Sequence, residues 1–130
     1  NCTVIVSDEE IGSPSVSNPD LLIAMNLPSF DKFEPMVKAG GTIFCDSTLI
    51  DKKSERTDLK AVYIPATGLA NENGLGGFAN VIILGKILKE TGIFDYEAFT
   101  NFLVSSIPAT KAALIEKNKK ALELGYTYEG

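Results

Sequence analysis

The chain has 130 residues, 45% of them hydrophobic and 22% charged, with a formal net charge of −5. That length supports one hydrophobic core, so a single domain over residues 1–130 is expected. An acidic chain with one arginine offers no basic surface for nucleic acid, and its apolar runs are far shorter than the roughly 20 residues of a membrane span. We expect a cytoplasmic protein with neither nucleic acid nor membrane as a partner.

Histidine is absent from the sequence, and the two cysteines, Cys2 and Cys45, lie in separate strand-like segments without CxxC spacing. The usual ligand sets for zinc, haem and iron–sulfur clusters are therefore missing, as are Ser-His and Cys-His nucleophile pairs. We predict that both cysteines are small buried hydrophobic residues, and that the chain holds no metal and no catalytic residue.

The chain starts inside an apolar stretch, Asn1–Val6, which is typical of a β-strand. We expect from this that it begins partway through a domain whose N-terminal part is missing. Turn signals follow at 7–14 and 17–20. The next apolar run, Leu21–Asn26, has the continuous character of a strand buried on both faces of a mostly parallel sheet.

A helix and a strand are expected next. Ser29 is placed to cap a helix that ends near Gly40, with Pro35 kinking or splitting it. A strand at Thr42–Asp46 then completes a strand-helix-strand unit. The hydrophilic segment Asp51–Lys60 has charges of both signs, so we interpret it as a solvated loop.

The segment from Val62 to Leu88 is predicted to contain a buried strand at 62–66, a glycine-rich turn at 68–77 and a buried helix from Phe78. That helix is apolar almost all the way round, so both of its sides must be covered. The sheet covers one side in this interpretation, and a second chain is a candidate for the other.

Two further helices are predicted at the end of the chain. Asp95 is placed to cap the first, which carries Phe99, Phe102 and Leu103 on one side. Pro108 lies in the first turn of the second, and Gly125 is placed as the glycine that ends it. The order of elements predicts an α/β fold, a three-layer α/β/α arrangement with a helical C-terminal tail.

The segment Gly74–Ala79 satisfies the G-x-G-x-x-A pattern of dinucleotide-binding turns, and Asp95 follows at the spacing of a ribose-binding acid. In that fingerprint the glycines follow a strand directly, whereas residues 67–73 intervene here. A permissive turn is favoured over a cofactor site, with Gly74 and Gly76 kept as candidate cofactor-binding residues. Phosphate at the N-terminus of the helix stays an option.

Three carboxylates, Asp46, Asp51 and Glu72, lie at or near the carboxyl ends of predicted strands, where open α/β sheets bind ligands. Polar loop residues and helix caps are the favoured interpretation of all three. Asn118, on the apolar side of the last helix, is expected to bond a neighbouring carbonyl rather than a substrate.

A series of short motifs runs through essentially the whole chain. Its members are Ser7-Asp8-Glu9-x-Ile11, Asn18–Ala24, Lys38–Gly41 before a strand to Ser47, Ile64–Thr67, Gly74 with Asn80, and Asn118-x-x-Ala121-x-x-x-Gly125-Tyr126. Together these motifs resemble the gamma subunit of 2-oxoacid:ferredoxin oxidoreductases, a unit that also forms a domain of single-chain pyruvate:ferredoxin oxidoreductases.

The resemblance implies a multi-subunit enzyme that decarboxylates a 2-oxoacid, makes an acyl-CoA and reduces ferredoxin. Thiamine diphosphate, iron–sulfur clusters and coenzyme A would lie on or near other subunits, the thiamine-binding alpha and beta and a ferredoxin-like delta. The gamma unit would be an auxiliary partner that packs on the thiamine-binding units and helps shape the route for coenzyme A. Its glycine-rich N-terminal segment would precede Asn1.

The sequence departs from the family pattern at the turn. Gly74 is followed by Leu75 instead of asparagine, and Gly77 stands where a basic residue is expected, which weakens an anion-binding role. Asn80 is retained as a candidate cofactor-binding residue, either as a clamp on the loop or as a helix-start cap. Two alternatives stay open: the smaller subunit of indolepyruvate:ferredoxin oxidoreductase, and a free-standing dinucleotide-binding domain.

Overall fold

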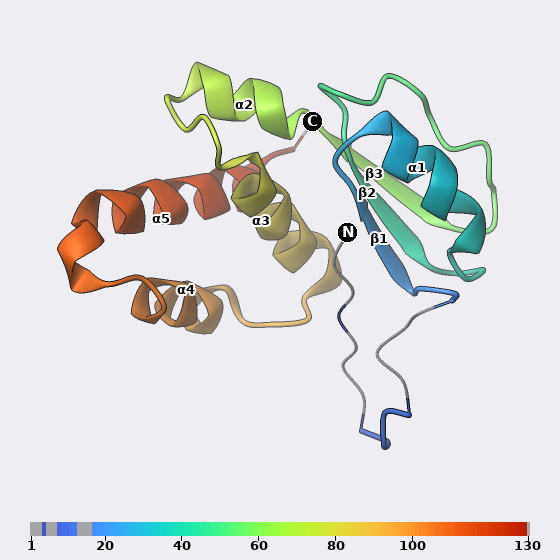
Figure 1. The fold of residues 1–130 in the computed structure, drawn as a ribbon, viewed down its shortest axis with the longest axis horizontal. Helices are drawn as coiled ribbons and strands as arrows, with labels where there is room; N and C mark the ends of the chain where they lie inside the picture. The colour runs from blue at the N-terminus through green and yellow to red at the C-terminus, as the bar shows by residue number, and fades with distance from the viewer. Residues whose placement is uncertain (1–3, 5–7, 13–16, 130) are drawn as a thin grey trace.

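A computed structural model describes residues 4, 8–12 and 17–129, so the strand predicted at Asn1–Val6 lies, apart from Val4, outside the described residues. The elements, in chain order (Figure 1), are β1 (Leu21–Ala24), α1 (Leu27–Phe33), a 3-10 turn η1 (Glu34–Met36), β2 (Thr42–Asp46), β3 (Lys60–Ile64), α2 (Ala66–Glu72), α3 (Ala79–Thr91), α4 (Tyr96–Ser105), a second 3-10 turn η2 (Ala109–Lys111) and α5 (Ala112–Thr127).

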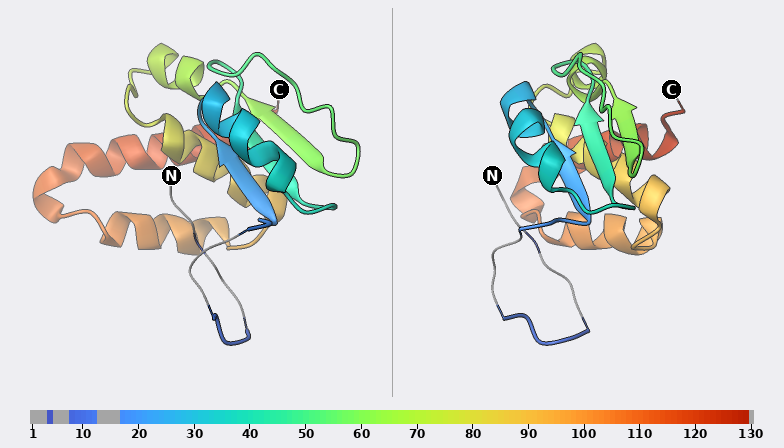
Figure 2. Two further views of the ribbon diagram at one scale, coloured as in Figure 1. Left: turned by 45° about the vertical axis from the view of Figure 1, so that its right-hand side comes forward. Right: turned by 90° about the vertical axis from the view of Figure 1, so that its right-hand side faces the viewer.

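The described sheet has three parallel strands in the order β1-β2-β3. Side chains alternate between its two faces, as the period of two in a strand requires. Phe44 and Ile64 pack with α3 and α5 on one face, whereas Ile43 and Cys45 pack with Phe30 of α1 on the other. The helices therefore enclose the sheet from both sides (Figure 2), which confirms the predicted α/β fold and its helical C-terminal region.

β1 differs from the prediction because it lies at an edge of the described sheet. Only Ala24 is buried in this strand, and Ile23 is 45% exposed. The strand buried on both faces is β2, which pairs with a neighbour on each side. A continuous apolar run predicts a strand, but it does not say which position in the sheet that strand takes.

The start of α1 also differs from the prediction, since the cap is Asn26 rather than Ser29. The Asn26 side chain accepts a hydrogen bond of 2.9 Å from the backbone N–H of Ser29. Pro28 then occupies the first turn, where a proline costs no helical hydrogen bond. Pro35 splits the segment into α1 and η1, as one of the two sequence alternatives predicted.

Helix α2 occupies much of the stretch predicted to be a glycine-rich turn. The turn itself comprises only residues 73–78. Asp46, fully buried at the end of β2, explains why the helix forms there. Its carboxylate accepts hydrogen bonds from the Thr67 hydroxyl at 2.5 Å and from the Thr67 N–H at 3.3 Å. This tertiary anchor outweighs the low helix propensity of Gly68.

Helix α3 is buried as predicted, and it ends at Gly92, whose N–H bonds to the Leu88 carbonyl in a left-handed cap. The sheet covers one side of α3. Helix α5 of the same chain covers another, so the suggested second chain is not needed for this purpose. The buried Lys86 amine donates to the Tyr128 carbonyl at 2.9 Å and pairs with Glu90 at 3.1 Å, which ties α3 to the end of the described chain.

The prediction that Gly125 ends the last helix is wrong, because Gly125 is buried inside α5 at the crossing with α3. A Cβ atom at Gly125 would overlap the carbonyl oxygen of Ile82, and one at Gly85 would overlap the carbonyl oxygen of Leu122. The two glycines therefore let the helix backbones touch. A side chain on either residue would force the helices apart.

Among the described helices, none is by itself long and apolar enough to cross a membrane. Helix α4 and residues 109–127 together have the length and composition of a membrane span, but the two segments are bent by 108° relative to each other.

Gly125→Ala is expected to lower the free energy of unfolding by about 3 kcal/mol, because the added methyl group has no space between two backbones. Helix propensity alone would raise it by up to about 1 kcal/mol, so the sign of the change in urea unfolding is decisive. Gly76→Ala, where an added Cβ has no neighbour nearer than 4.0 Å, serves as the control. Equal or greater stability of Gly125→Ala would refute the close crossing.

Asp46→Asn is expected to lower the free energy of unfolding by about 2 kcal/mol, since it replaces charge-assisted hydrogen bonds inside the core. Thr67→Val should lower the free energy of unfolding by a similar amount. The double variant should lose less than the two single losses combined, because both substitutions break the same contact. Asp51→Asn, at an exposed carboxylate, is the control. Additive losses in the double-mutant cycle would contradict the Asp46–Thr67 link.

Candidate functional site

The glycine turn, residues 73–78, connects α2 to α3 and contains two of the candidate site residues. Gly74 and Gly77 have positive φ angles of 67° and 89°, a conformation that glycine adopts without strain. Leu75 is 2% exposed, and its N–H bonds to the Ala70 carbonyl at 2.7 Å. The buried leucine anchors the turn, and the flanking glycines supply the bends.

The turn does not have the geometry of a dinucleotide-binding fingerprint. Helix α2 lies between β3 and the glycines, so the turn does not carry a strand directly into a helix N-terminus. Asp95, the expected ribose partner in that interpretation, is instead the N-cap of α4 and accepts a 3.0 Å hydrogen bond from the Ala98 N–H. The predicted cap is thereby confirmed.

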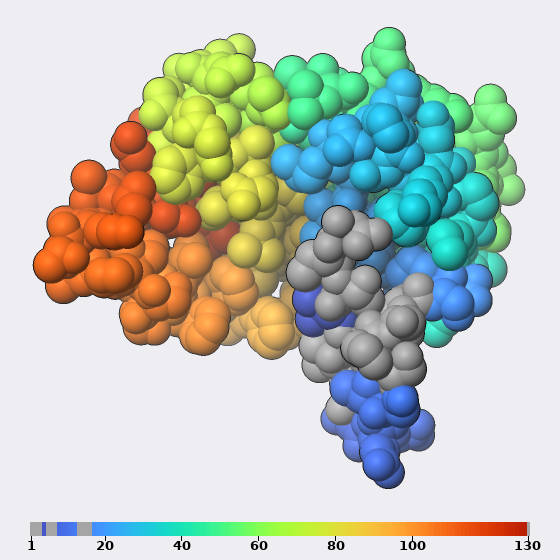
Figure 3. Space-filling model, in the orientation of Figure 1, coloured from blue at the N-terminus to red at the C-terminus, as the bar shows by residue number. Residues whose placement is uncertain are grey.

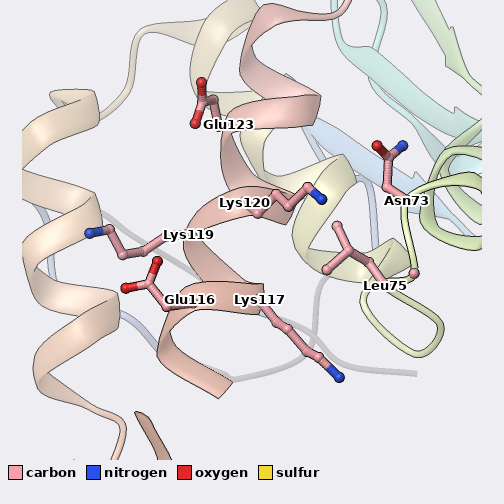
Figure 4. A pocket seen from close by; sticks show the side chains of 8 residues that line it. Asn73, Leu75, Glu116, Lys117, Lys119, Lys120 and Glu123 are labelled. Atoms are coloured by element: carbon pink, nitrogen blue, oxygen red, sulfur yellow. The ribbon is translucent and has the colours of Figure 1, made fainter. Parts of the chain in front are cut away.

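A cleft of about 540 Å³ lies between the glycine turn and α5 (Figure 4). It brings Gly74 together with charged side chains of α5, whereas Gly76 and Asn80 are not part of its lining. Lys120 extends toward Asn73 and Leu75 in the view of Figure 4, and Lys119 projects the opposite way. The lining residues are Asn73, Gly74, Leu75, Glu116, Lys117, Lys119, Lys120 and Glu123.

The charges of this cleft have both signs, since Glu116 and Glu123 lie among its lysines. Such a mixture produces no strong field of a single sign for a phosphate group. The cleft is therefore a mixed-charge hollow beside one candidate residue, Gly74, and it does not have the charge of a preformed anion site.

The two asparagines singled out in the sequence make local hydrogen bonds. Asn80 is exposed in the first turn of α3, and its side-chain oxygen accepts a 2.9 Å bond from the Val81 N–H. The N-cap of α3 is Phe78, which makes no side-chain cap hydrogen bond, so the cap role predicted for Asn80 is wrong. Asn118 donates to the Leu114 carbonyl at 2.7 Å, the backbone bond expected for it.

The three carboxylates weighed for acid/base chemistry lie in different settings. Asp46 is buried and bonded to Thr67, and it also accepts a hydrogen bond of 3.1 Å from the Thr48 N–H. Asp51 is exposed in the loop after β2, and Glu72 is the exposed last residue of α2 rather than a strand-end residue. Asp46 is therefore neither the polar loop residue nor the helix cap favoured from the sequence, but a buried residue at the end of β2. Its partner Thr67 was missed, because the contact joins residues that are 21 positions apart in the sequence.

Cys45 is fully buried against the α1 side of the sheet, and burial raises the pKa of its thiol to about 12. The thiol is therefore protonated near neutral pH, which confirms a small buried hydrophobic residue here, while Cys2 lies outside the described residues. Within the described part of the chain, no group of three or more His, Cys, Asp or Glu residues is arranged to hold a metal ion.

Comparison with known proteins identifies relatives of the whole chain. The sequence model of the pyruvate ferredoxin/flavodoxin oxidoreductase family matches residues 1–128. The chain is 37% identical over 127 residues to the ketoisovalerate oxidoreductase subunit VorA of Methanothermobacter marburgensis, covering 96% of this chain and 26% of that protein. It is 32% identical over 125 residues to the 2-oxoglutarate synthase subunit KorC of Methanocaldococcus jannaschii, covering 95% and 65%.

Solved structures have the same fold. The gamma subunit of a keto/oxoacid ferredoxin oxidoreductase from Geobacter sulfurreducens superposes with a TM-score of 0.73 at 27% identity, over 82% of this chain and 62% of that chain. The 2-oxoglutarate:ferredoxin oxidoreductase of Magnetococcus marinus gives 0.76 at 18% identity, over 92% and 21%, a likeness of fold alone. This chain belongs to the pyruvate ferredoxin/flavodoxin oxidoreductase family, and its fold is that of a gamma subunit.

Proposed function

We propose that this chain is the gamma-type unit of a 2-oxoacid:ferredoxin oxidoreductase. The complex would decarboxylate a 2-oxoacid oxidatively, form an acyl-CoA and pass electrons to ferredoxin. The observation that carries the proposal is the family match over residues 1–128, together with the gamma-subunit fold. The complex would be cytoplasmic, as the composition suggests.

The role proposed for this unit is structural, with the chemistry supplied elsewhere. The Asp46 carboxylate is hydrogen-bonded to Thr67, and the Cys45 thiol is protonated inside the core. The cleft beside Gly74 carries charges of both signs. The described residues therefore do not fit an iron–sulfur cluster, which needs several cysteine thiolates. Thiamine diphosphate and the clusters would lie on thiamine-binding alpha and beta units and a ferredoxin-like delta unit.

Coenzyme A would be held mainly by neighbouring units. Gly74, Gly76 and Asn80 stay candidate cofactor-binding residues, and Gly74 is the one of them that lines the mixed-charge cleft. Gly76 and Asn80 have less support as cofactor-binding residues, since neither lines this cleft.

Neither alternative is favoured. The relatives described above are named for ketoisovalerate and 2-oxoglutarate enzymes, not for an indolepyruvate enzyme. A free-standing dinucleotide-binding domain would need the glycine turn to follow a strand, and α2 lies between them.

Reconstitution tests the proposal. The full-length chain and its companion subunits are purified separately and combined, and reduction of ferredoxin is followed with coenzyme A and one of four acids: pyruvate, 2-oxoglutarate, ketoisovalerate or indolepyruvate. We expect no turnover by this chain alone and turnover of one preferred acid by the complete set. Omitting this chain should lower the rate at least about tenfold, a barrier increase of about 1.4 kcal/mol.

Two results would contradict the proposal. One is 2-oxoacid turnover by the purified chain without companions. The other is an unchanged rate for the companion subunits when this chain is left out.

A further inference from the structure

Helix α4 is an apolar helix without a buried residue. Phe102 is 67% exposed, and Ile93 and Phe94, in the segment before the helix, are 57% and 53% exposed. The helix runs beside α5 and away from the sheet (Figure 1), and Figure 3 shows it in orange at the surface of the molecule. A helix of this composition is normally covered on its apolar side.

The exposed apolar side chains form one continuous surface. We call Phe94, Ala98, Phe99 and Phe102 the aromatic face. The ring centroids of Phe94 and Phe99 are 6.0 Å apart, and those of Phe99 and Phe102 are 6.2 Å apart. These four residues, with Asp95, line a hollow of about 360 Å³. A contiguous apolar surface of this kind is typical of an interaction site, unlike apolar residues that are exposed singly.

A neighbouring side of α4 is already occupied. The Tyr96 and Tyr126 rings pack with their centroids 4.3 Å apart, which joins α4 to α5. Rotation of the helix to bury the aromatic face would break this contact. The aromatic face is therefore held outward by the fold.

Charge and shape together define the chemistry of the occupant. Between Gly92 and Thr110 the chain carries two acids, Asp95 and Glu97, and no lysine or arginine. Asp95 lines the hollow, so a second copy would bring its own Asp95 and its own hollow to the same place. A partner with a protruding apolar side chain and lysine or arginine beside it would complement both features.

We propose that the aromatic face of α4 docks this chain onto another unit of the oxidoreductase, through an apolar side chain of that unit flanked by basic residues. The inference rests on the proposed function, which provides the partner. Phe102 is the most exposed aromatic residue of the face and the expected centre of the contact.

The test uses the full-length chain, co-expressed with its companion subunits, and measures assembly by light scattering and by the dissociation constant of the complex. Phe102→Gln, which keeps helix propensity and adds no charge, should weaken assembly at least about 30-fold, as removal of an aromatic hot spot does. Phe102→Leu keeps apolar bulk and should retain affinity to within about threefold. Unfolding temperatures of the two variants should match, because the side chain is largely exposed.

A matched control is Leu49→Gln, since Leu49 is 53% exposed in the turn after β2 and should leave assembly unchanged. Glu97→Lys tests the charge argument, and assembly of this variant should slow and become less dependent on salt. Asp95 is left intact because it caps α4.

Assembly of Phe102→Gln with wild-type affinity would overturn the inference and leave the proposed function standing. Dimers of the chain alone that Phe102→Gln converts to monomers would also overturn it, in favour of a second copy. Failure of the wild-type chain to join the oxidoreductase at all would overturn the proposed function and the inference with it.

Discussion

The close crossing of α3 and α5 determines where most other parts of this chain can lie. Gly85 and Gly125 let the two backbones touch, so α3 is enclosed between α5 and the sheet. Close-packed interiors yield little to an added atom, so this geometry leaves no alternative position for α5. Because α5 is fixed, the tyrosine pair at its end fixes α4 as well. An outward-facing aromatic helix thus follows from a backbone contact on the other side of α5.

At the carboxyl end of β2, the Asp46 side chain is hydrogen-bonded within the fold. Open α/β sheets commonly bind ligands at this edge, and Asp46 lies there. Its carboxylate is instead bonded to the start of α2, which brings Ala66 and Ala70 into the core. Among the described residues, two hollowed surfaces lie elsewhere: the mixed-charge cleft beside Gly74 and the aromatic face. Both favour contacts between protein units over chemistry within this one.

The sequence predicted the elements whose signals are local. The strand at Thr42–Asp46, the cap at Asp95 and the buried helix after Phe78 all depend on neighbouring residues, and the structure contains each of them. Helix α2 was missed because its start depends on Asp46, some twenty residues earlier in the chain. Gly125 was misplaced because a glycine that ends a helix and a glycine at a helix crossing look alike in sequence.

Sequence periodicity also did not predict which apolar side of a helix is exposed. It identified Phe99 and Phe102 as one side of a helix, yet the rule that apolar sides face the core would bury them. The glycine pattern from Gly74 to Ala79 matched a cofactor motif, although only the position of the preceding strand gives that pattern its chemistry. In both instances the pattern was real, and the surroundings that decide its meaning come from the tertiary structure.

Hydrogen–deuterium exchange of the wild-type chain, free and in the assembled oxidoreductase, is the most direct measurement of this division between core and docking surface. The amides of α3 and α5 at the glycine crossing should be strongly protected in both states, because they belong to the core. The amides of α4 should exchange rapidly in the free chain and at least about tenfold more slowly after assembly. Equal exchange of α4 in the two states, or rapid exchange at the crossing in the free chain, would contradict this division between core and docking surface.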